Sequence, residues 1–232
     1  MPIYEREKNY ISLLAEREYT ISELSKILFV SEPTVRRDIL SMKKDELVEC
    51  VRGRVRLKTS SPDKRIPLFV RDFRNNEQKQ KIAEKAAVLV KDGMVIMLDA
   101  STTACCIVPY LAVFHNLFVI TSGARTAIAL ASVGIRTVCT GGELALESLS
   151  YIGGDAMRTL SSYTADIAFF SCSGLSDGGL ATDNSIAEND MRKIMMSRAE
   201  KSYLLCDSSK FGKLDLNIIC DIKNIDGVIT DS

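Results

Sequence analysis

The strongest constraint on the fold is an alternation that begins near residue 77 and continues through the rest of the sequence. Stretches with helical periodicity alternate there with short apolar runs of strand length. Such an alternation is typical of an α/β domain with a mostly parallel sheet. It predicts helices over 77–91, 102–112, 123–133 and 184–200, and strands over 94–98, 117–121, 135–139, 166–171, 202–206 and 226–230.

Residues 1–58 have a different pattern, which predicts three short helices and a basic hairpin. Apolar residues at helical spacing predict a first helix over 4–17. "TISE" predicts a capping box at Thr20 for the second helix, and Ser31 is placed to cap the third. "VECVRGRVRLK" then alternates apolar and basic residues around Gly53. This order of elements is that of a winged helix-turn-helix.

A segment rich in Ser, Pro and charge, "TSSPDKRIP", separates the two patterns and is typical of a linker. We therefore predict a winged helix-turn-helix domain over 1–58, a linker over 59–76 and an α/β domain over 77–232. The predicted fold class is thus a small N-terminal winged helix-turn-helix followed by a larger α/β domain with a mostly parallel sheet.

The net charge of the whole chain is uninformative, but the distribution of charged residues along the sequence is informative. The 30 basic and 30 acidic residues cancel, so the whole chain has no net field that favours nucleic acid or a membrane. Residues 31–58, however, hold 8 basic and 5 acidic residues. The basic excess therefore falls on the third predicted helix and the hairpin.

The seven cysteines form no CxxC pair, which fits neither a disulfide framework nor a zinc site. We expect reduced thiols, no metal and no cofactor. The N-terminal residues contain no apolar leader, and no apolar run approaches the ~20 residues of a membrane span. We therefore expect a soluble, cytoplasmic protein without a membrane partner.

The third predicted helix carries side chains that suit double-stranded DNA. Arg36 and Arg37 are adjacent, so they diverge by about 100° on a helix. One can then contact a phosphate while the other approaches base edges. Thr34 offers a hydroxyl and a methyl group to a base near the helix N-terminus.

The predicted wing adds arginines at alternate positions, Arg52, Arg54 and Arg56, which would share one strand face. The alternative is a small helical domain with a solvated charged face. The cap, the proline, the paired arginines and the basic hairpin occur together in the expected order, which favours DNA binding. The predicted DNA contacts are Ser31, Thr34, Arg36, Arg37, Arg52 and Arg54.

Polar loops follow four of the predicted strands of the second domain. "VIMLDASTTACC" places hydroxyls at the start of a helix, where free backbone N–H groups also suit an anion such as phosphate. "ITSG" follows the second strand and "CTGGEL" the third, and "LLCDSSKFGK" places Asp207 and Lys210 at the end of a later strand. Open α/β sheets bind ligands beyond the carboxyl ends of their strands, so these loops are predicted to converge on one ligand. Each loop alone is also explained by simple turn chemistry.

At these residues a family resemblance appears. "TISELSKILFVSEPTVRRDILSMKKDELV" resembles the N-terminal helix-turn-helix of DeoR-type transcriptional regulators. "DASTT", "TGGEL", the "GG" after "SYI" and "DSSKFG" resemble motifs of their C-terminal half, so the likeness covers nearly the whole chain. It implies a sugar-phosphate sensor domain related in fold to ribose-phosphate isomerases and CoA transferases. It also implies a repressor whose operator affinity is controlled by a bound phosphorylated sugar or related metabolite.

The resemblance also implies which residues contact the effector. "DASTT" matches the family's phosphate loop, and Lys210 would supply a mobile cation beside Asp207. Asp99 would repel a phosphate, so we assign it to a sugar hydroxyl or to hydrogen bonds within the loop. The family usually has Asn where Ser122 stands, which would alter sugar preference.

A further segment, "IAENDMRK", matches a part of the family that carries an acid and a base. Glu188, Arg192 and Lys193 are therefore candidates, although Glu188 and Arg192 are also spaced as an ion pair on one helix. The predicted effector contacts are Asp99, Ser101, Thr102, Thr103, Thr121, Ser122, Gly141, Gly142, Glu143, Ser173, Glu188, Arg192, Lys193, Asp207 and Lys210.

The serious alternative is a sugar-phosphate isomerase-like enzyme with an appended DNA-binding domain, because this fold also hosts such isomerases. Those enzymes carry acids in a pattern like DGADE at one strand end, where this chain has "SCSGLSDGG". Asp177 in that segment is predicted to be a turn residue, and the single histidine, His115, a surface or cap residue. We therefore expect a sensor with no catalytic residues, assembled as a homo-oligomer (dimer or tetramer) that reads two half-sites.

Overall fold

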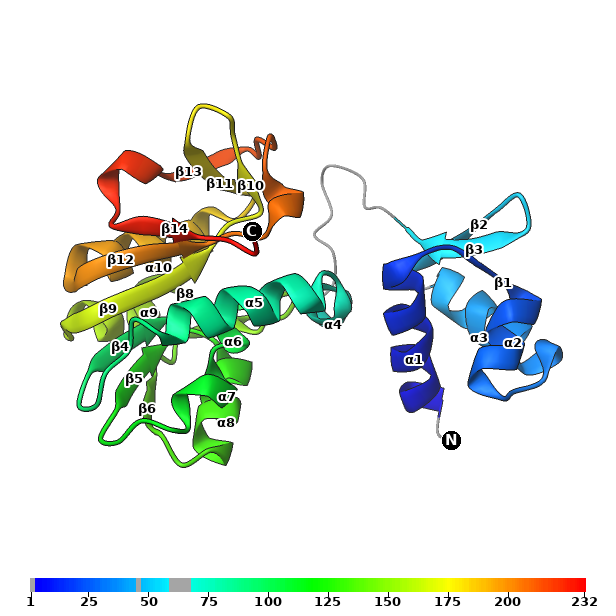
Figure 1. Cartoon of the computed structure of the whole chain (residues 1–232), viewed down its shortest axis with the longest axis horizontal. Helices are drawn as coiled ribbons and strands as arrows, with labels where there is room; N and C mark the ends of the chain where they lie inside the picture. The colour runs from blue at the N-terminus through cyan, green and yellow to red at the C-terminus, as the bar shows by residue number, and fades with distance from the viewer. Residues whose placement is uncertain (1–2, 45–46, 59–67) are drawn as a thin grey trace. The chain divides into compact units, whose positions relative to one another are not determined.

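The computed structural model describes residues 3–44, 47–58 and 68–232. The chain divides into two compact units, Met1–Asn76 and Glu77–Ser232 (Figure 1). Each unit has its own hydrophobic core, and each is described separately.

The N-terminal unit contains the predicted three helices and wing. The helices are α1 (Ile3–Glu16), α2 (Ile21–Leu28) and α3 (Glu32–Lys44). The strands β1 (Tyr19–Thr20), β2 (Val48–Val51) and β3 (Arg54–Leu57) form an antiparallel sheet in the order β1-β3-β2. The apolar faces of the helices meet in one core, whose buried members include Tyr10, Leu24, Val35, Ile39 and Met42. The predicted winged helix-turn-helix is confirmed.

The predicted helix starts are also confirmed. The Thr20 hydroxyl accepts from the Glu23 N–H at 3.2 Å, and the Glu23 carboxylate accepts from the Thr20 N–H at 2.7 Å, which completes the capping box. The backbone N–H of Thr20, followed by its hydroxyl, lowers the pKa of Glu23 to about 2. The Ser31 hydroxyl accepts from the Thr34 N–H at 3.4 Å and so caps α3.

A buried charge inside this unit has no signal in the local sequence pattern. The Asp38 carboxylate, on the inner face of α3, accepts from Arg6 at 2.8 and 3.1 Å and from the Tyr10 hydroxyl at 3.2 Å. Burial first, and then the Asp38 charge, raise the pKa of Tyr10 to about 12. This network ties α1 to α3 because a buried carboxylate is stable only when it is paired.

The turn between α2 and α3 contains an unusual residue. Phe29 ends α2 in the left-handed region, with a φ of 53°, and its side chain is 94% exposed. Glycine is the common residue at such a helix end, since a Cβ is strained there. Phe29 therefore carries backbone strain without compensating burial in this unit.

Replacing Phe29 with glycine should stabilise the N-terminal unit by about 1 kcal/mol, because the strain is relieved and no buried contact is lost. The measurement is hydrogen exchange of the α2 and α3 amides in the full chain, which should be slower in the glycine variant than in the wild type. Phe29→Ala is the matched control, since it removes the same ring but keeps the Cβ and the strain. Equal protection in both variants would contradict the explanation.

The predicted linker is only partly described. Residues 59–67 lie outside the described residues. The remainder contains a helix, α4 (Leu68–Phe73), which contacts α1, and Phe73 packs against the core of the N-terminal unit. The proposed boundaries of the linker stay a prediction.

The C-terminal unit is built on six parallel strands in the order β14-β12-β9-β4-β5-β6. Each of the six predicted apolar runs is one of these strands. They are β4 (Val95–Leu98), β5 (Phe118–Thr121), β6 (Arg136–Cys139), β9 (Ala165–Ser171), β12 (Ala199–Leu205) and β14 (Gly227–Ile229). The predicted parallel α/β domain is confirmed.

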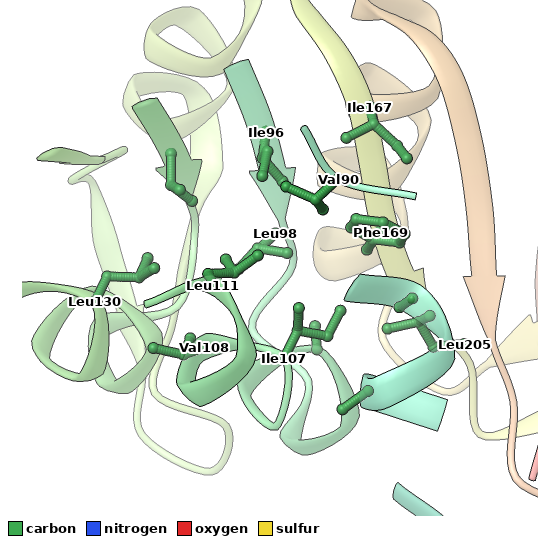
Figure 2. Packing of buried hydrophobic residues seen from close by; sticks show 14 of the residues in the cluster. Val90, Ile96, Leu98, Ile107, Val108, Leu111, Leu130, Ile167, Phe169 and Leu205 are labelled. Carbon is green, nitrogen blue, oxygen red and sulfur yellow. The ribbon is translucent and has the colours of Figure 1, made fainter. Parts of the chain in front are cut away.

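Helices cover both faces of this sheet. Successive strand residues point to opposite faces, so Ile96 and Leu98 of β4 belong to one core and Met97 to the other. Figure 2 shows the first core, where Ile96 and Leu98 lie among apolar side chains from helices and neighbouring strands. That core is covered by α5 (Asn76–Ala87), α6 (Thr102–Cys105), α7 (Val108–Leu111) and α8 (Ala124–Ser132), and the second core by α9 (Gly153–Ser161) and α10 (Ile186–Arg198).

The helix α9 was not predicted, and two further details differ from the sequence-based expectation. The helix predicted over 102–112 is divided into α6 and α7, because Pro109 has no N–H with which to continue the helical hydrogen bonds. Additional strands form two small sheets, β7 (Glu143–Ala145) with β8 (Ser150–Ile152), and β10 (Gly174–Leu175), β11 (Leu180–Asp183) and β13 (Asn217–Asp221). Two 3-10 turns, Ser208–Lys210 and Ile222–Asn224, complete the unit.

Candidate functional site

The carboxyl ends of the six parallel strands lie at one edge of the sheet, and the polar loops predicted from the sequence leave from that edge. Parallel pairing brings these chain-distant segments together, because neighbouring strands end side by side. Polar residues at these strand ends, or within two residues of them, include Asp99, Thr121, Thr140, Ser171 and Asp207.

The loop between β4 and α6 is held by Asp99. One carboxylate oxygen of Asp99 accepts from the Ser101 N–H at 3.0 Å, and the other accepts from the Ser171 N–H at 3.1 Å. The Ser101 hydroxyl caps α6 by accepting from the Ala104 N–H at 3.1 Å. The hydroxyls of Thr102 and Thr103 follow in the first turn of α6 and make no side-chain hydrogen bond with the described residues. They are therefore available to an anion.

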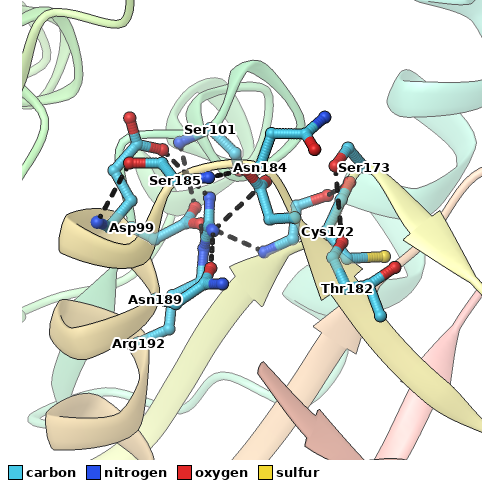
Figure 3. A network of polar contacts seen from close by, with 12 residues as sticks. Asp99, Ser101, Cys172, Ser173, Thr182, Asn184, Ser185, Asn189 and Arg192 are labelled. Atoms are coloured by element: carbon cyan, nitrogen blue, oxygen red, sulfur yellow. Dashed lines mark hydrogen bonds and ion pairs between the residues drawn. The ribbon is translucent and has the colours of Figure 1, made fainter. Parts of the chain in front are cut away.

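Arg192 of α10 is the centre of a buried ionic network, shown in Figure 3. Its side chain is only 5% exposed, and it donates to Asp99 at 3.0 Å and to the Asn189 side-chain oxygen at 2.8 Å. It also lies 3.2 Å from the carboxylate of Asp183 and 3.3 Å from that of Glu188. Burial alone would lower the pKa of Arg192, but Asp183, Asp99 and Glu188 together raise it above its ordinary value. One guanidinium thus neutralises part of the charge of three buried carboxylates.

Lys210 provides a second cation near the same strand ends. Its Nζ donates to the Ser171 hydroxyl at 2.9 Å and lies 3.4 Å from the Asp207 carboxylate. The Ser171 hydroxyl in turn donates to the Leu205 carbonyl at 2.7 Å. Lys210 is partly buried, with its side chain 18% exposed. It is therefore positioned at the ends of β9 and β12 rather than free in solvent.

The loops after β5 and β6 lie against each other. Thr121 forms a local turn, since its hydroxyl accepts from the Gly123 N–H at 3.0 Å, and its carbonyl accepts from the Thr140 N–H at 3.0 Å. A Cβ on Gly123 would lie 3.0 Å from the Ala100 Cα, so glycine lets this loop approach the β4–α6 loop closely. Ser122 is buried beside them.

Two hydroxyls near these loops are buried without a hydrogen-bond partner among the described residues, those of Thr140 and Ser148. Ser148 precedes Leu149, whose carbonyl accepts from the Ala124 N–H at the start of α8. A buried hydroxyl without a partner costs about 1–3 kcal/mol. These two positions therefore favour a polar ligand or water, and the sequence pattern gave no reason to select either of them.

Other predicted effector residues take no part in the buried ionic network. Lys193 is exposed on α10, where it faces away from the buried Arg192, so adjacent helix positions do not share the site. Glu143 is exposed in β7. Gly142 has a φ of 102°, and a Cβ there would lie 2.8 Å from the Ile152 carbonyl, so this glycine serves packing within the protein. Gly141 is also left-handed, with a φ of 64°.

The remaining predicted residues lie near the network. Ser173 donates to the Asp215 carboxylate at 2.6 Å, and Asp177 is exposed in the turn between β10 and β11, as predicted. Asp183 and Asn189 hold Arg192 and were not selected from the sequence. The position of Asn189 three residues before Arg192 on one helix face was the available signal. His115 is exposed in the connection to β5.

The predicted DNA-contacting face of α3 is exposed. Arg36 lies 3.4 Å from Glu32 in an exposed pair, and Arg37, Lys43 and Lys44 are also exposed. The Thr34 hydroxyl lies 2.9 Å from that of Ser31, which fixes it at the start of the helix. Exposed ion pairs of this kind contribute little to stability, so Arg36 can exchange Glu32 for a phosphate.

The wing differs from the prediction in one respect. Arg52 is not on a strand with Arg54, because it forms the hairpin turn with Gly53, at φ values of 50° and 79°. Arg54 and Arg56 do lie on β3, where Arg54 is 3.9 Å from Glu23, and Arg56 pairs with Glu49 at 2.7 Å. The tip of the wing therefore presents Arg52, while the other two arginines contact acids of the same unit.

Two other features are absent from the described ranges. No group of three or more His, Cys, Asp or Glu side chains is arranged to hold a metal ion there. No helix in the described part of the chain has both the length and the apolar character needed to cross a membrane.

Comparison with known families gives two matches. Residues 74–232 match the model of the DeoR C terminal sensor domain, and residues 11–49 match the bacterial regulatory protein, arsR family. The HTH-type transcriptional regulator GolR of Listeria innocua serovar 6a is 35% identical over 231 residues, which cover 99% of this chain and 91% of that protein. The lactose phosphotransferase system repressor of Staphylococcus epidermidis is 29% identical over 233 residues, which cover 99% and 92%.

Solved structures share the fold at lower identity. A chain of eIF2B delta from Chaetomium thermophilum is 19% identical, with a TM-score of 0.51, and the likeness covers 71% of this chain and 59% of that one. Ribose 5-phosphate isomerase A from Methanocaldococcus jannaschii is 24% identical, with a TM-score of 0.46, and the likeness covers 60% and 56%. The chain thus spans little more than half of each of these structures, and the likeness concerns the α/β fold alone.

Proposed function

This chain belongs to the DeoR family of helix-turn-helix transcriptional regulators, and on that premise we propose that it is a repressor controlled by a phosphorylated sugar. The N-terminal unit binds operator DNA through α3 and the tip of the wing. The C-terminal unit binds the phosphorylated sugar, or a related metabolite, at the carboxyl edge of its parallel sheet. The two binding events are coupled, so that the effector changes operator affinity.

The observation that carries the effector proposal is the convergence of unpaired hydroxyls at one sheet edge. Thr102 and Thr103 have free hydroxyls at the start of α6, and Thr140 and Ser148 have buried hydroxyls without partners. A phosphorylated sugar supplies both an anion for the first pair and hydroxyls for the second. The fixed cation Lys210 stands at the ends of two neighbouring strands.

The positions and partners of the acidic side chains near the strand ends favour a sensor over an isomerase-like enzyme. The end of β9 carries Ser171, Cys172 and Ser173, which are not general bases comparable to carboxylates. The buried acids nearby, Asp99, Asp183 and Glu188, are all paired with Arg192. The relatives are likewise named as transcriptional regulators and repressors.

A screen of pentose, hexose and amino-sugar phosphates should find compounds that raise the thermal unfolding midpoint of the full chain, because a ligand of the folded state stabilises it. The matching unphosphorylated sugars are the controls and should have no effect. The stabilising compound should be recovered unchanged after prolonged incubation, as followed by NMR. Conversion at enzyme-like rates would instead establish the isomerase alternative.

Replacing both Arg36 and Arg37 with alanine should weaken DNA binding and flatten its dependence on salt. Each lost phosphate contact lowers the slope of log affinity against log salt by about 0.9. Fluorescence anisotropy with operator DNA at several salt concentrations measures this slope. Lys193→Ala, an exposed charge change in the other unit, is the control. An unchanged affinity of the double variant at low salt would contradict the role of α3.

We also propose a homo-oligomer, a dimer or a tetramer, because helix-turn-helix proteins gain affinity by contacting two half-sites at once. Light scattering of the purified chain tests this. A cytoplasmic location follows from the proposed partners, since operator DNA and phosphorylated sugars are both present there.

A further inference from the structure

Two thiols meet at the edge of the sheet, and the regulatory function described above uses neither of them. Cys172 directly follows β9 and Cys206 directly follows β12. These strands are parallel neighbours, and their last register pair is Leu205 with Ser171. The two cysteines are therefore the next pair along the strands. Their Sγ atoms lie 3.8 Å apart, and both residues are buried.

The separation suits a disulfide bond. Neighbouring strands lie about 4.8 Å apart, which falls within the Cα separations that disulfides span. Both thiols already point toward each other, as the 3.8 Å distance requires. Bond formation therefore needs the two sulfur atoms to approach by less than about 2 Å, a local shift at the strand ends that leaves the strand order and register unchanged.

The surroundings make one of the two thiols reactive. The hydrogen bond with Cys206, and then the nearby charges of Lys210 and Arg192, lower the pKa of Cys172 against the effect of burial. The contact with Cys172, together with burial, raises the pKa of Cys206. These opposite shifts favour Cys172 over Cys206 as the thiol that ionises and acts as the nucleophile.

We propose that Cys172 and Cys206 form a redox-responsive pair, which a hydroperoxide converts to an intramolecular disulfide. The Cys172 thiolate attacks the distal oxygen of the peroxide, so that an S–O bond forms and the O–O bond breaks. The alkoxide or hydroxide that leaves takes up from solvent the proton that Cys172 lost on ionisation, and departs as an alcohol or water. The Cys206 sulfur then attacks the Cys172 sulfur, the S–S bond forms, and the hydroxyl group leaves as water with the Cys206 proton. The two thiols lose two electrons, and the peroxide gains them.

The bond would also alter the proposed effector site, and this part rests on the proposed function. Cys172 lies between Ser171 and Ser173, and Cys206 precedes Asp207, so the disulfide would shift the strand ends that hold Lys210. Oxidation should therefore change the affinity of the C-terminal unit for a sugar phosphate. The formation of the disulfide itself does not depend on whether a sugar phosphate is the effector.

Mass spectrometry tests the pair directly in the full-length protein. After exposure to hydrogen peroxide, blocking of free thiols and digestion with trypsin, the peptide Thr159–Arg192 should be found linked to the peptide Ser202–Lys210. Each of these peptides contains one cysteine, so the link identifies the bond without ambiguity. A thiol reductant should reverse it.

Matched variants distinguish the Cys172–Cys206 disulfide from nonspecific oxidation of other cysteines. Cys172→Ala and Cys206→Ala should each abolish the linked peptide, whereas Cys220→Ala, at a third thiol of the same core, and Cys50→Ala, at an exposed thiol of the other unit, should retain it. The digest of the wild-type protein shows whether the disulfide forms, even if one variant fails to fold. The proposal is overturned if peroxide oxidises Cys50 in the wild-type protein while Cys172 and Cys206 stay unlinked. A failed sugar-phosphate screen would leave this readout unaffected.

Discussion

Replacing Arg192 with methionine should lower the free energy of unfolding of the C-terminal unit by about 3–5 kcal/mol, the range for removal of one partner of a buried ionic network. The methionine fills a similar volume, so the loss is electrostatic. Asp99, Asp183 and Glu188 would remain within the protein without the guanidinium that they share. Asp99 also holds the β4–α6 loop and the end of β9, so the damage should spread to the candidate effector site.

Urea unfolding of the full chain measures this loss of stability. Hydrogen exchange of the β4 and β9 amides then shows whether the loss falls on these strands. Lys193→Met changes the neighbouring exposed cation and should leave the unfolding midpoint unchanged. If Arg192→Met unfolds at the wild-type urea concentration, the network does not stabilise this unit.

Replacing Thr102 and Thr103 together with valine should reduce the affinity for the phosphorylated sugar at least about tenfold. Each hydrogen bond to a charged group contributes about 1.5–3 kcal/mol, and valine removes the hydroxyl with little change of volume. Neither hydroxyl has another side-chain partner in the described residues, so the folded structure should be kept. Calorimetric titration with the compound identified in the screen measures the affinity.

Thr159→Val is the matched control for that double variant, because Thr159 is a half-buried threonine near the end of α9, away from the strand ends. Its effector affinity should equal that of the wild type. Operator binding without effector should also survive in the double variant, since the N-terminal unit is unchanged. Equal affinities of the double variant and the wild type for the sugar phosphate would exclude the β4–α6 loop as the phosphate site.

The fold was predictable where short-range patterns determine it. The six strands of the parallel sheet were each visible as an apolar run, and the Thr20 capping box is a contact between residues three apart. Arg52 was misplaced because strand alternation and a two-residue turn give similar patterns around Gly53. α9 was missed because it begins directly after a strand, with two glycines in its first turn.

The candidate site was less predictable, since its interactions join distant parts of the chain. Arg192 and Glu188 suggested only a local ion pair, whereas the contact between Arg192 and Asp99 spans 93 residues and depends on strand order. The loops were predicted to meet because parallel strands end together. Which hydroxyls stay free, as at Thr140 and Ser148, depends on packing that no local pattern specifies.

We propose that a phosphorylated sugar and operator DNA act on the same chain in opposition. The direct measurement is operator affinity, determined by fluorescence anisotropy at fixed salt with and without a saturating amount of the compound from the screen. A coupling of 1–3 kcal/mol is typical of such systems, so operator affinity should fall by about 5-fold to 150-fold. Linkage requires the same factor for the effect of DNA on effector affinity. If the compound binds the full chain and operator affinity stays the same, this account of the protein is wrong.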